Sequence, residues 1–146
     1  MSIGFYIGQV IIVLFTVFFA HHNAPSANHF SNYGALPNVI DKFHKNGFRT
    51  RMIVVAGVAL LLLPPFGAED INNALLSGVV NAGWSSLLFD PILNKSRKVG
   101  LSWDYIGTDD GVGRRLIKLF GSNAGEWKAI ISLFIVVATN ILYVWI

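Results

Sequence analysis

The chain has 146 residues, of which 53% are hydrophobic and only 13% charged, and it carries a net charge of +3 and no cysteine. Soluble domains carry about 25% charged residues, so this chain has too little charge to cover the surface of a soluble fold. The absence of cysteine excludes a disulfide framework, thiol catalysis and thiolate metal ligands. The composition therefore favours a lipid-facing protein, organised as a single domain over residues 1–146.

Four apolar stretches follow one another along the chain and predict four transmembrane spans. The first, at about 3–20, has no charged residue and is about 27 Å long as a helix, close to the thickness of a bilayer's hydrocarbon core. The others lie at about 50–66, 71–90 and 128–146. Helices are the expected spanning unit, because a β-barrel would need many strands in which apolar and polar residues alternate. The sequence therefore predicts an all-α bundle of four transmembrane helices with short interfacial amphipathic helices.

The segments that link these stretches differ in character. Residues 21–36 are rich in His, Asn and Ser, so we expect them to be irregular. Pro37 begins a predicted interfacial helix that leads into the second span. Residues 91–127 form the longest polar segment, and within it basic and apolar residues alternate over 114–120. That alternation predicts a second amphipathic helix on the membrane surface.

The basic residues predict the topology. They fall into two groups, which are Lys42, Lys45, Arg49 and Arg51, then Lys95, Arg97, Lys98, Arg114, Arg115, Lys118 and Lys128. By the positive-inside rule, loops 21–49 and 91–127 are cytoplasmic and both termini lie outside the cytoplasm. With both termini on the same side of the membrane, the number of spans must be even. We therefore favour four spans over the alternative of three spans, in which the third stretch lies on the membrane surface. The residues predicted to contact lipid phosphates are Arg49, Arg51, Arg114, Arg115 and Lys118.

Small residues recur at helical spacing in the first and third stretches. The predicted helix-packing or oligomer face consists of Gly4, Gly8, Ala74, Gly78, Asn81, Ala82 and Ser86. Small side chains let helix backbones approach closely, and lipid supplies no hydrophobic drive of its own for that approach. Packing within this chain is the favoured interpretation. The alternative is a face between copies, with a polar path around Asn81 beside Ser77 and Ser85.

Candidate catalytic and metal-binding residues form no recognisable set. The histidines, His21, His22, His29 and His44, match no metal-site spacing. The acids and bases over 104–115 lack the pattern of the membrane enzymes that transfer phospho-alcohols from cytidine nucleotides, because position 107 is glycine. We therefore expect no catalytic residue, no cofactor and no metal, and a lipid-modifying enzyme that uses 104–115 is a distant alternative.

One stretch of the chain resembles a pattern in small uncharacterised membrane proteins of bacterial and phage genomes. That pattern is an FDPxxN sequence, an Arg, a WxYxG sequence and a later basic residue. Its counterparts here are Asp90, Pro91, Asn94, Arg97, Trp103, Tyr105, Gly107 and Arg114. The chain differs at the last element, where Arg114 follows a glycine in place of an acid. The resemblance implies a phage-encoded or phage-related protein and supplies no catalytic residues.

The residues of this motif also have a physical interpretation. Pro91 is expected to end or kink the third helix just below the bilayer. Asp90 and Arg97 are close enough in sequence to pair. Trp103 and Tyr105 are expected to anchor the returning chain at the interface. The motif thus predicts a structural element that fixes the third helix to the cytoplasmic segment.

The small size, the missing catalytic set and the scarcity of extramembrane mass favour a non-enzymatic structural or assembly subunit of a larger membrane complex. The expected location is a bacterial inner membrane or a virion membrane. The expected partners are membrane lipids with other membrane or capsid proteins, or copies of the chain itself, and no nucleic acid. The alternative is a small homo-oligomeric, holin-like pore, favoured by the polar row of Ser77, Asn81 and Ser85.

Overall fold

The computed structural model describes residues 3–33, 37–61, 63, 70–97 and 111–145, and its regular elements are all helical. They are α1 (Ile3–Tyr33), α2 (Pro37–Leu60), α3 (Ile71–Ser96), α4 (Gly111–Phe120), the 3₁₀ turn η1 (Gly121–Asn123) and α5 (Ala124–Trp145). No strand occurs in these residues. The prediction of an all-α fold is confirmed for this part of the chain.

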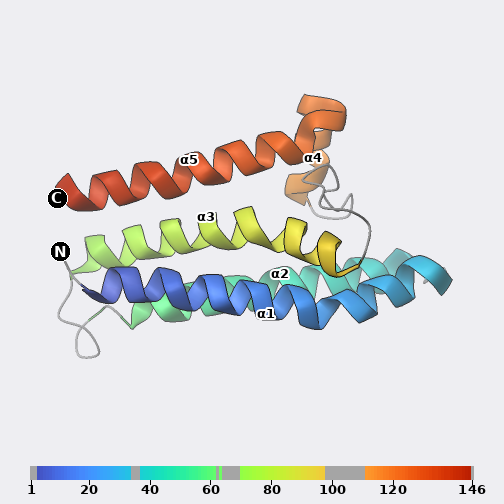
Figure 1. Ribbon diagram of the computed structural model, residues 1–146, viewed down its shortest axis with the longest axis horizontal. Helices are drawn as coiled ribbons and strands as arrows, with labels where there is room; N and C mark the ends of the chain where they lie inside the picture. The colour runs from blue at the N-terminus through green and yellow to red at the C-terminus, as the bar shows by residue number, and fades with distance from the viewer. Residues whose placement is uncertain (1–2, 34–36, 62, 64–69, 98–110, 146) are drawn as a thin grey trace.

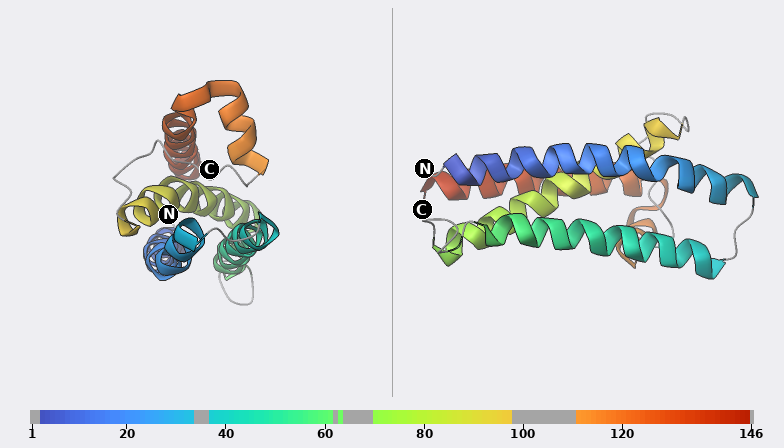
Figure 2. Two further views of the ribbon diagram at one scale, coloured as in Figure 1. Left: turned by 90° about the vertical axis from the view of Figure 1, so that its right-hand side faces the viewer. Right: turned by 90° about the horizontal axis from the view of Figure 1, so that it is seen from below.

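The helices form a layered bundle around α3. Figures 1 and 2 show α3 between α5 on one side and the pair α1 and α2 on the other, and α3 packs against all three of them. α1 and α3 run in one direction and α2 and α5 return in the other, so α1 begins and α5 ends at the same end of the bundle (Figure 1). α4 lies at the opposite end. Because α3 is central, its side chains determine how the bundle is held together.

α1 is longer than the sequence predicted. Residues 21–33, expected to be irregular, continue the helix past Pro25 to Tyr33, so that prediction is wrong. The reason is tertiary packing, since Ala20 and Ala24 form a buried cluster with Leu93 of α3. Contacts of this kind override the weak helix preference of a segment rich in Asn and Ser.

α3 begins at a side-chain cap and continues past a proline. The Asp70 carboxylate accepts a hydrogen bond from the Asn73 backbone N–H at 2.9 Å, which satisfies one of the free donors of the first turn. The helix then passes Pro91 and ends at Ser96, so Pro91 does not end it as one reading of the sequence predicted. Leu93 holds the last turns in place, because its side chain packs against α1 and its carbonyl accepts the Arg97 N–H at 2.9 Å.

The remaining helices differ from the predictions at their boundaries. α2 is one continuous helix from Pro37 to Leu60, so the predicted interfacial helix and second span are joined. It ends before the Pro64-Pro65 pair, whose first proline disfavours helical geometry at the residue before it. α4 confirms the predicted amphipathic helix. Gly121, with φ 58°, then supplies the left-handed turn that leads into α5.

Candidate functional site

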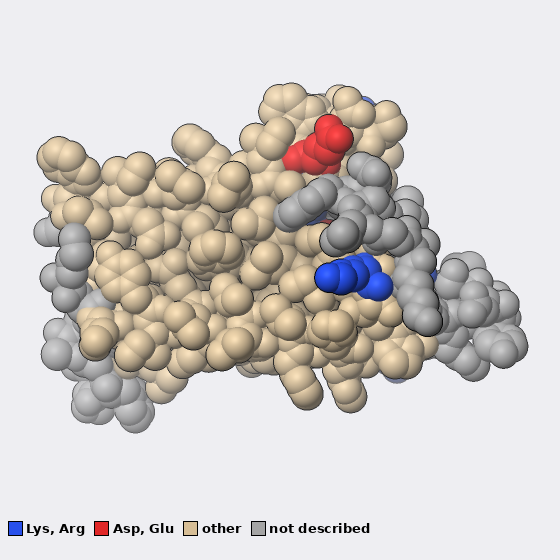
Figure 3. Space-filling view, viewed as in Figure 1, with Lys and Arg blue, Asp and Glu red and all other residues tan. Residues whose placement is uncertain are grey.

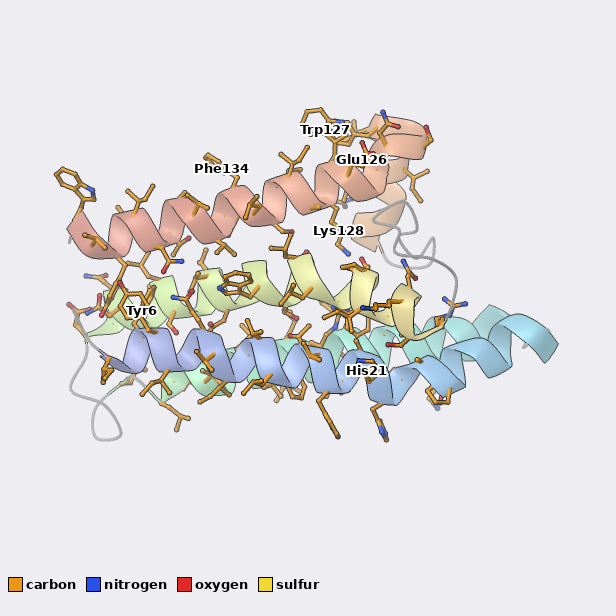
Figure 4. All side chains as sticks on the ribbon, viewed as in Figure 1. Tyr6, His21, Glu126, Trp127, Lys128 and Phe134 are labelled. Atoms are coloured by element: carbon orange, nitrogen blue, oxygen red, sulfur yellow. The ribbon has the colours of Figure 1, made fainter. Side chains whose placement is uncertain are left out.

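The interior of the bundle contains many polar side chains, whereas its outer faces are apolar. The buried polar residues are Gln9, Thr16, Ser77, Asn81, Ser85, Asn94, Ser132 and Thr139. Outward-facing residues include Phe18, Ile53 and Phe134, which are 68%, 71% and 71% exposed, and Figure 4 shows Phe134 pointing away from the other helices. A protein in water would expose the polar set and bury the apolar one. The outer faces of the bundle are therefore strongly apolar, while its interior mixes these polar residues with apolar clusters.

Apart from Asp70 at the start of α3, the charged residues of the described helices lie toward the end of the bundle opposite the termini. α1 has no Asp, Glu, Lys or Arg, α3 has none from Ile71 to Phe89, and α5 has none after Lys128. Figure 3 shows the charged atoms of the visible face confined to the end opposite the termini. The charge-free part of α3 is about 27 Å long at 1.5 Å per residue, which matches the thickness of a hydrocarbon core. By length and composition, two described helical stretches, Ile3–Ser26 and Arg115–Trp145, are able to cross a membrane.

A hydrogen-bond network joins three helices inside this apolar region. Trp84 Nε1 of α3 donates to Gln9 Oε1 of α1 at 2.8 Å, and Gln9 Nε2 donates to Asn140 Oδ1 of α5 at 3.0 Å. Asn140 Nδ2 in turn donates to the Val136 carbonyl at 2.8 Å. The sequence analysis missed this network. The signal that could have found it is the isolated amide side chain in each of two strongly apolar stretches, because such groups need partners in lipid.

Replacing Gln9 with leucine should therefore destabilise the bundle. The substitution leaves the Trp84 N–H and the Asn140 amide without their shared partner. Because buried hydrogen bonds in membrane proteins average about 0.6 kcal/mol each, we expect a loss of about 1–2 kcal/mol. Asn72→Leu, at an exposed position of α3, is the matched control. The free energy of unfolding in mixed detergent micelles measures both variants, and equal effects would contradict a structural role for the network.

The polar row predicted on the third helix is buried within this one chain. Asn81 Nδ2 donates to Ser77 Oγ at 3.2 Å, and both side chains are fully buried. A Cβ placed on Gly8 would lie 3.6 Å from Ser77 Oγ and 3.7 Å from Asn81 Nδ2, so the backbone of α1 covers the row. Among the described residues, Asn81 Oδ1, Ser85 Oγ and Thr16 Oγ1 are buried without a hydrogen-bond partner. The row therefore faces α1 and not the exterior of the bundle.

The other residues of the predicted packing face lie at several helix contacts. Ala74 is buried on α3, and a Cβ on Gly78 would lie 3.7 Å from the Cβ of Ala59 of α2. Ala82 packs against the Ile12, Val55 and Val58 cluster of α1 and α2. Ser86 accepts a hydrogen bond from Ser132 Oγ of α5 at 3.0 Å. Gly4 is partly exposed near the start of α1. Gly78, Ala82 and Ser86 therefore contact other helices of the same chain.

A close contact between α3 and α5 involves a glycine that the sequence analysis did not select. A Cβ on Gly83 would lie 2.9 Å from Val136 Cγ2, 3.2 Å from Ile135 Cγ2 and 3.4 Å from the Ser132 carbonyl oxygen. The first distance is shorter than real Cβ contacts allow, so only glycine fits between α3 and α5 at this level. Gly83 lies outside the spacing of four followed from Ala74, which is why that pattern missed it.

An ion pair joins α3 and α5 at the charged end of the apolar region. Lys128 Nζ lies against Asp90 Oδ2, and the two side chains are only 16% and 17% exposed. Figure 4 shows Lys128 pointing from α5 toward α3. A small pocket beside the pair is lined by Ser86, Leu87, Asp90, Pro91, Gly125, Lys128 and Ala129. The predicted pairing of Asp90 with Arg97 is wrong, because the helix continues past Pro91 and turns the carboxylate toward α5.

The rest of the predicted cytoplasmic motif is described only in part. Pro91 and Asn94 are buried in α3, and Arg97 follows the helix as its C-terminal cap. Trp103, Tyr105 and Gly107 lie outside the described residues, as do Asp104, Asp109 and Asp110. The predicted anchoring role of Trp103 and Tyr105 therefore stays a prediction.

The residues predicted to contact lipid phosphates do not all point outward. Arg49, Arg115 and Lys118 are exposed, and the side chain of Arg114 lies outside the described part. Arg51 instead places its guanidinium 3.7 Å from the centre of the Phe89 ring of α3, a cation–π contact. Arg51 therefore helps to hold α2 against α3.

The histidines are dispersed. His21 Nδ1 lies 2.8 Å from Ser96 Oγ, which links α1 to the end of α3. His22 is exposed and stacks beside Phe18. The side chains of His29 and His44 lie outside the described part. Within that part, no three His, Asp or Glu side chains gather closely enough to hold a metal ion.

Comparisons with known proteins add no assignment. No protein-family model matches the sequence, and no curated protein or solved structure is detectably similar to it. The resemblance of the stretch from Asp90 to Arg114 to small bacterial and phage membrane proteins therefore stays a prediction. The chain's function is argued from its own structure.

Proposed function

We propose that the chain is a non-enzymatic integral membrane protein that serves as a structural or assembly subunit of a larger membrane complex. α1, α2, α3 and α5 would be its four spans. The observation that carries the proposal is the apolar outer surface of the bundle, where many large apolar side chains are exposed while amides and hydroxyls lie among the buried residues. In water this arrangement would expose a very large apolar surface, whereas lipid solvates it.

The direction of the helices supports a four-span topology. α1 begins and α5 ends at one end, and the described basic residues gather toward the other (Figures 1 and 3). This distribution is the one that the positive-inside rule associates with a cytoplasmic end, and it supports termini on the other side of the membrane. The membrane in question would be a bacterial inner membrane or a virion membrane.

The position of the polar row favours a structural subunit over a pore. A pore assembled from several copies needs polar residues on a face that the copies turn toward a shared channel. Here Asn81, Ser77 and Ser85 are at most 1% exposed, and Asn81 and Ser77 lie close to Gly8 of α1 in the same chain. The outward faces are apolar, which suits contact with lipids, with other membrane or capsid proteins, or with copies of the chain.

Single cysteine substitutions should reveal the transmembrane topology directly, because the chain contains no native cysteine that would react. Lys95→Cys and Asn72→Cys place thiols at exposed positions toward opposite ends of α3, and Phe134→Cys places one on the exposed middle of α5. We expect a membrane-impermeant maleimide to label Lys95→Cys only from the cytoplasmic side and Asn72→Cys only from the other. Phe134→Cys should stay unlabelled until detergent is added. Labelling of all three from one side of intact membranes would rule out the four-span arrangement.

Extraction in mild detergent tests the structural role. We expect the chain to leave its native membrane together with other proteins at a fixed ratio, measured from the mass and protein content of the extracted complex. A ring made of this chain alone that conducts ions after reconstitution would contradict the proposal and support the pore.

A further inference from the structure

The orientation of α4 differs from that of every long helix. The end-on view in Figure 2 shows α4 from the side, while α1 and α5 are seen nearly down their axes and α3 obliquely, so α4 lies across the bundle axis. It sits at the charged end, and η1 connects it to the start of α5. If the bundle axis is perpendicular to the plane of the membrane, α4 lies parallel to the membrane surface. Amphipathic helices that bind membrane interfaces adopt this orientation.

The side chains of α4 are arranged for such an interface. Arg115 and Lys118 are three residues apart and both are exposed, so they share one face of the helix. Leu119, four residues after Arg115, lies on the same side of the helix and is 73% exposed. Phe120 stacks on Trp127 of α5 with ring centroids 4.9 Å apart, which fixes the C-terminal end of α4 to the bundle. The exposed side of α4 therefore combines two basic side chains with one large apolar side chain.

We propose that α4 is a binding element for the anionic phospholipids of one leaflet, with Arg115 and Lys118 contacting lipid phosphates and Leu119 inserted among the acyl chains. The inference rests on the proposed membrane location and adds a preferred lipid. Charge complementarity carries it, because the described face holds two cations and no acid. The acidic residue Glu126 lies in the first turn of α5, where the helix dipole favours it.

Hydrogen exchange in lipid nanodiscs tests this binding on the full chain. The backbone amides of α4 should exchange more slowly in discs that contain phosphatidylglycerol than in discs of phosphatidylcholine alone. Each basic side chain near an anionic membrane surface changes the binding constant for that surface about fivefold. The double variant Arg115→Gln, Lys118→Gln should therefore speed the exchange of the α4 amides roughly tenfold or more, in the anionic discs only. High salt should have the same effect on the unmodified chain, because it screens exposed charges.

A charge-preserving pair, Arg115→Lys with Lys118→Arg, is the matched control and should keep the slow exchange. Equal exchange of α4 in the two lipids would overturn the inference. The amides of α3 and α5 separate this failure from failure of the membrane proposal. They should be protected in both kinds of disc if the chain spans the bilayer, and unprotected in both if it does not.

Discussion

A leucine in place of Gly83 should force α3 away from α5 and strongly destabilise the bundle. The Cβ alone would lie 2.9 Å from Val136 Cγ2, and β-branched Val136 and Ile135 cannot turn aside easily. The backbone carbonyl of Ser132 at 3.4 Å is no more able to move. We expect a loss at or above the upper end of the about 1–3 kcal/mol typical of overpacked cores. Unfolding of the purified chain in mixed micelles, followed by near-UV circular dichroism, measures it.

Gly57→Leu provides the control for this experiment. Gly57 also lies in an apolar helix, but nothing comes within 4 Å of a Cβ at that position. Because leucine has a higher helix propensity than glycine by roughly 0.5–1 kcal/mol, this variant should be as stable as the unmodified chain or slightly more so. If both leucine variants unfold alike, the close approach of α3 and α5 at Gly83 is wrong.

Removing the amine of Lys128 should produce the second large loss of stability. Lys128→Met leaves the Asp90 carboxylate in a site where it is only 17% exposed, with its cationic partner gone. Breaking a buried ion pair from one side costs about 3–5 kcal/mol, and the residual exposure of Asp90 places the expected loss toward the lower value. The free energy of unfolding in micelles is again the measurement.

The double variant decides whether the pairing itself is responsible. Lys128→Met combined with Asp90→Asn removes both charges and should recover most of the lost stability, because no charge is then left unpaired. Lys95→Met, at an exposed position of α3, should have little effect. If the double variant is as unstable as Lys128→Met alone, an unpaired Asp90 charge does not account for the loss.

The helical class could be predicted from the sequence because apolar stretches of span length leave few alternatives. Boundaries were harder to predict. Residues 21–33 have a loop-like composition, yet they are helical because Ala24 packs on α3. Pro91 was expected to end or kink the helix, and the first alternative is wrong because α3 continues to Ser96, where Leu93 packs against α1. Each of these errors arose because contacts between helices outweighed a local preference.

The polar interior was predictable only in part. The row of Ser77, Asn81 and Ser85 was visible because its members recur at a spacing of four on one helix. The Gln9–Asn140 link was not, since it joins residues 131 positions apart and no local pattern relates them. Gly83 shows the same difficulty. Its importance comes from the Val136 and Ile135 side chains of another helix, which nothing within α3 indicates.

The central position of α3 has a consequence for biosynthesis. α1, α2 and α3 emerge from the ribosome first, and α3 contacts both of the others, so these three helices can associate before α5 is made. α5 then meets a surface on which Gln9, Ser86 and Asp90 still lack the partners that it brings. A helix shifted by one turn would leave these groups unpaired in the interior of the bundle. The register of α5 is therefore specified by polar groups on helices that are made before it.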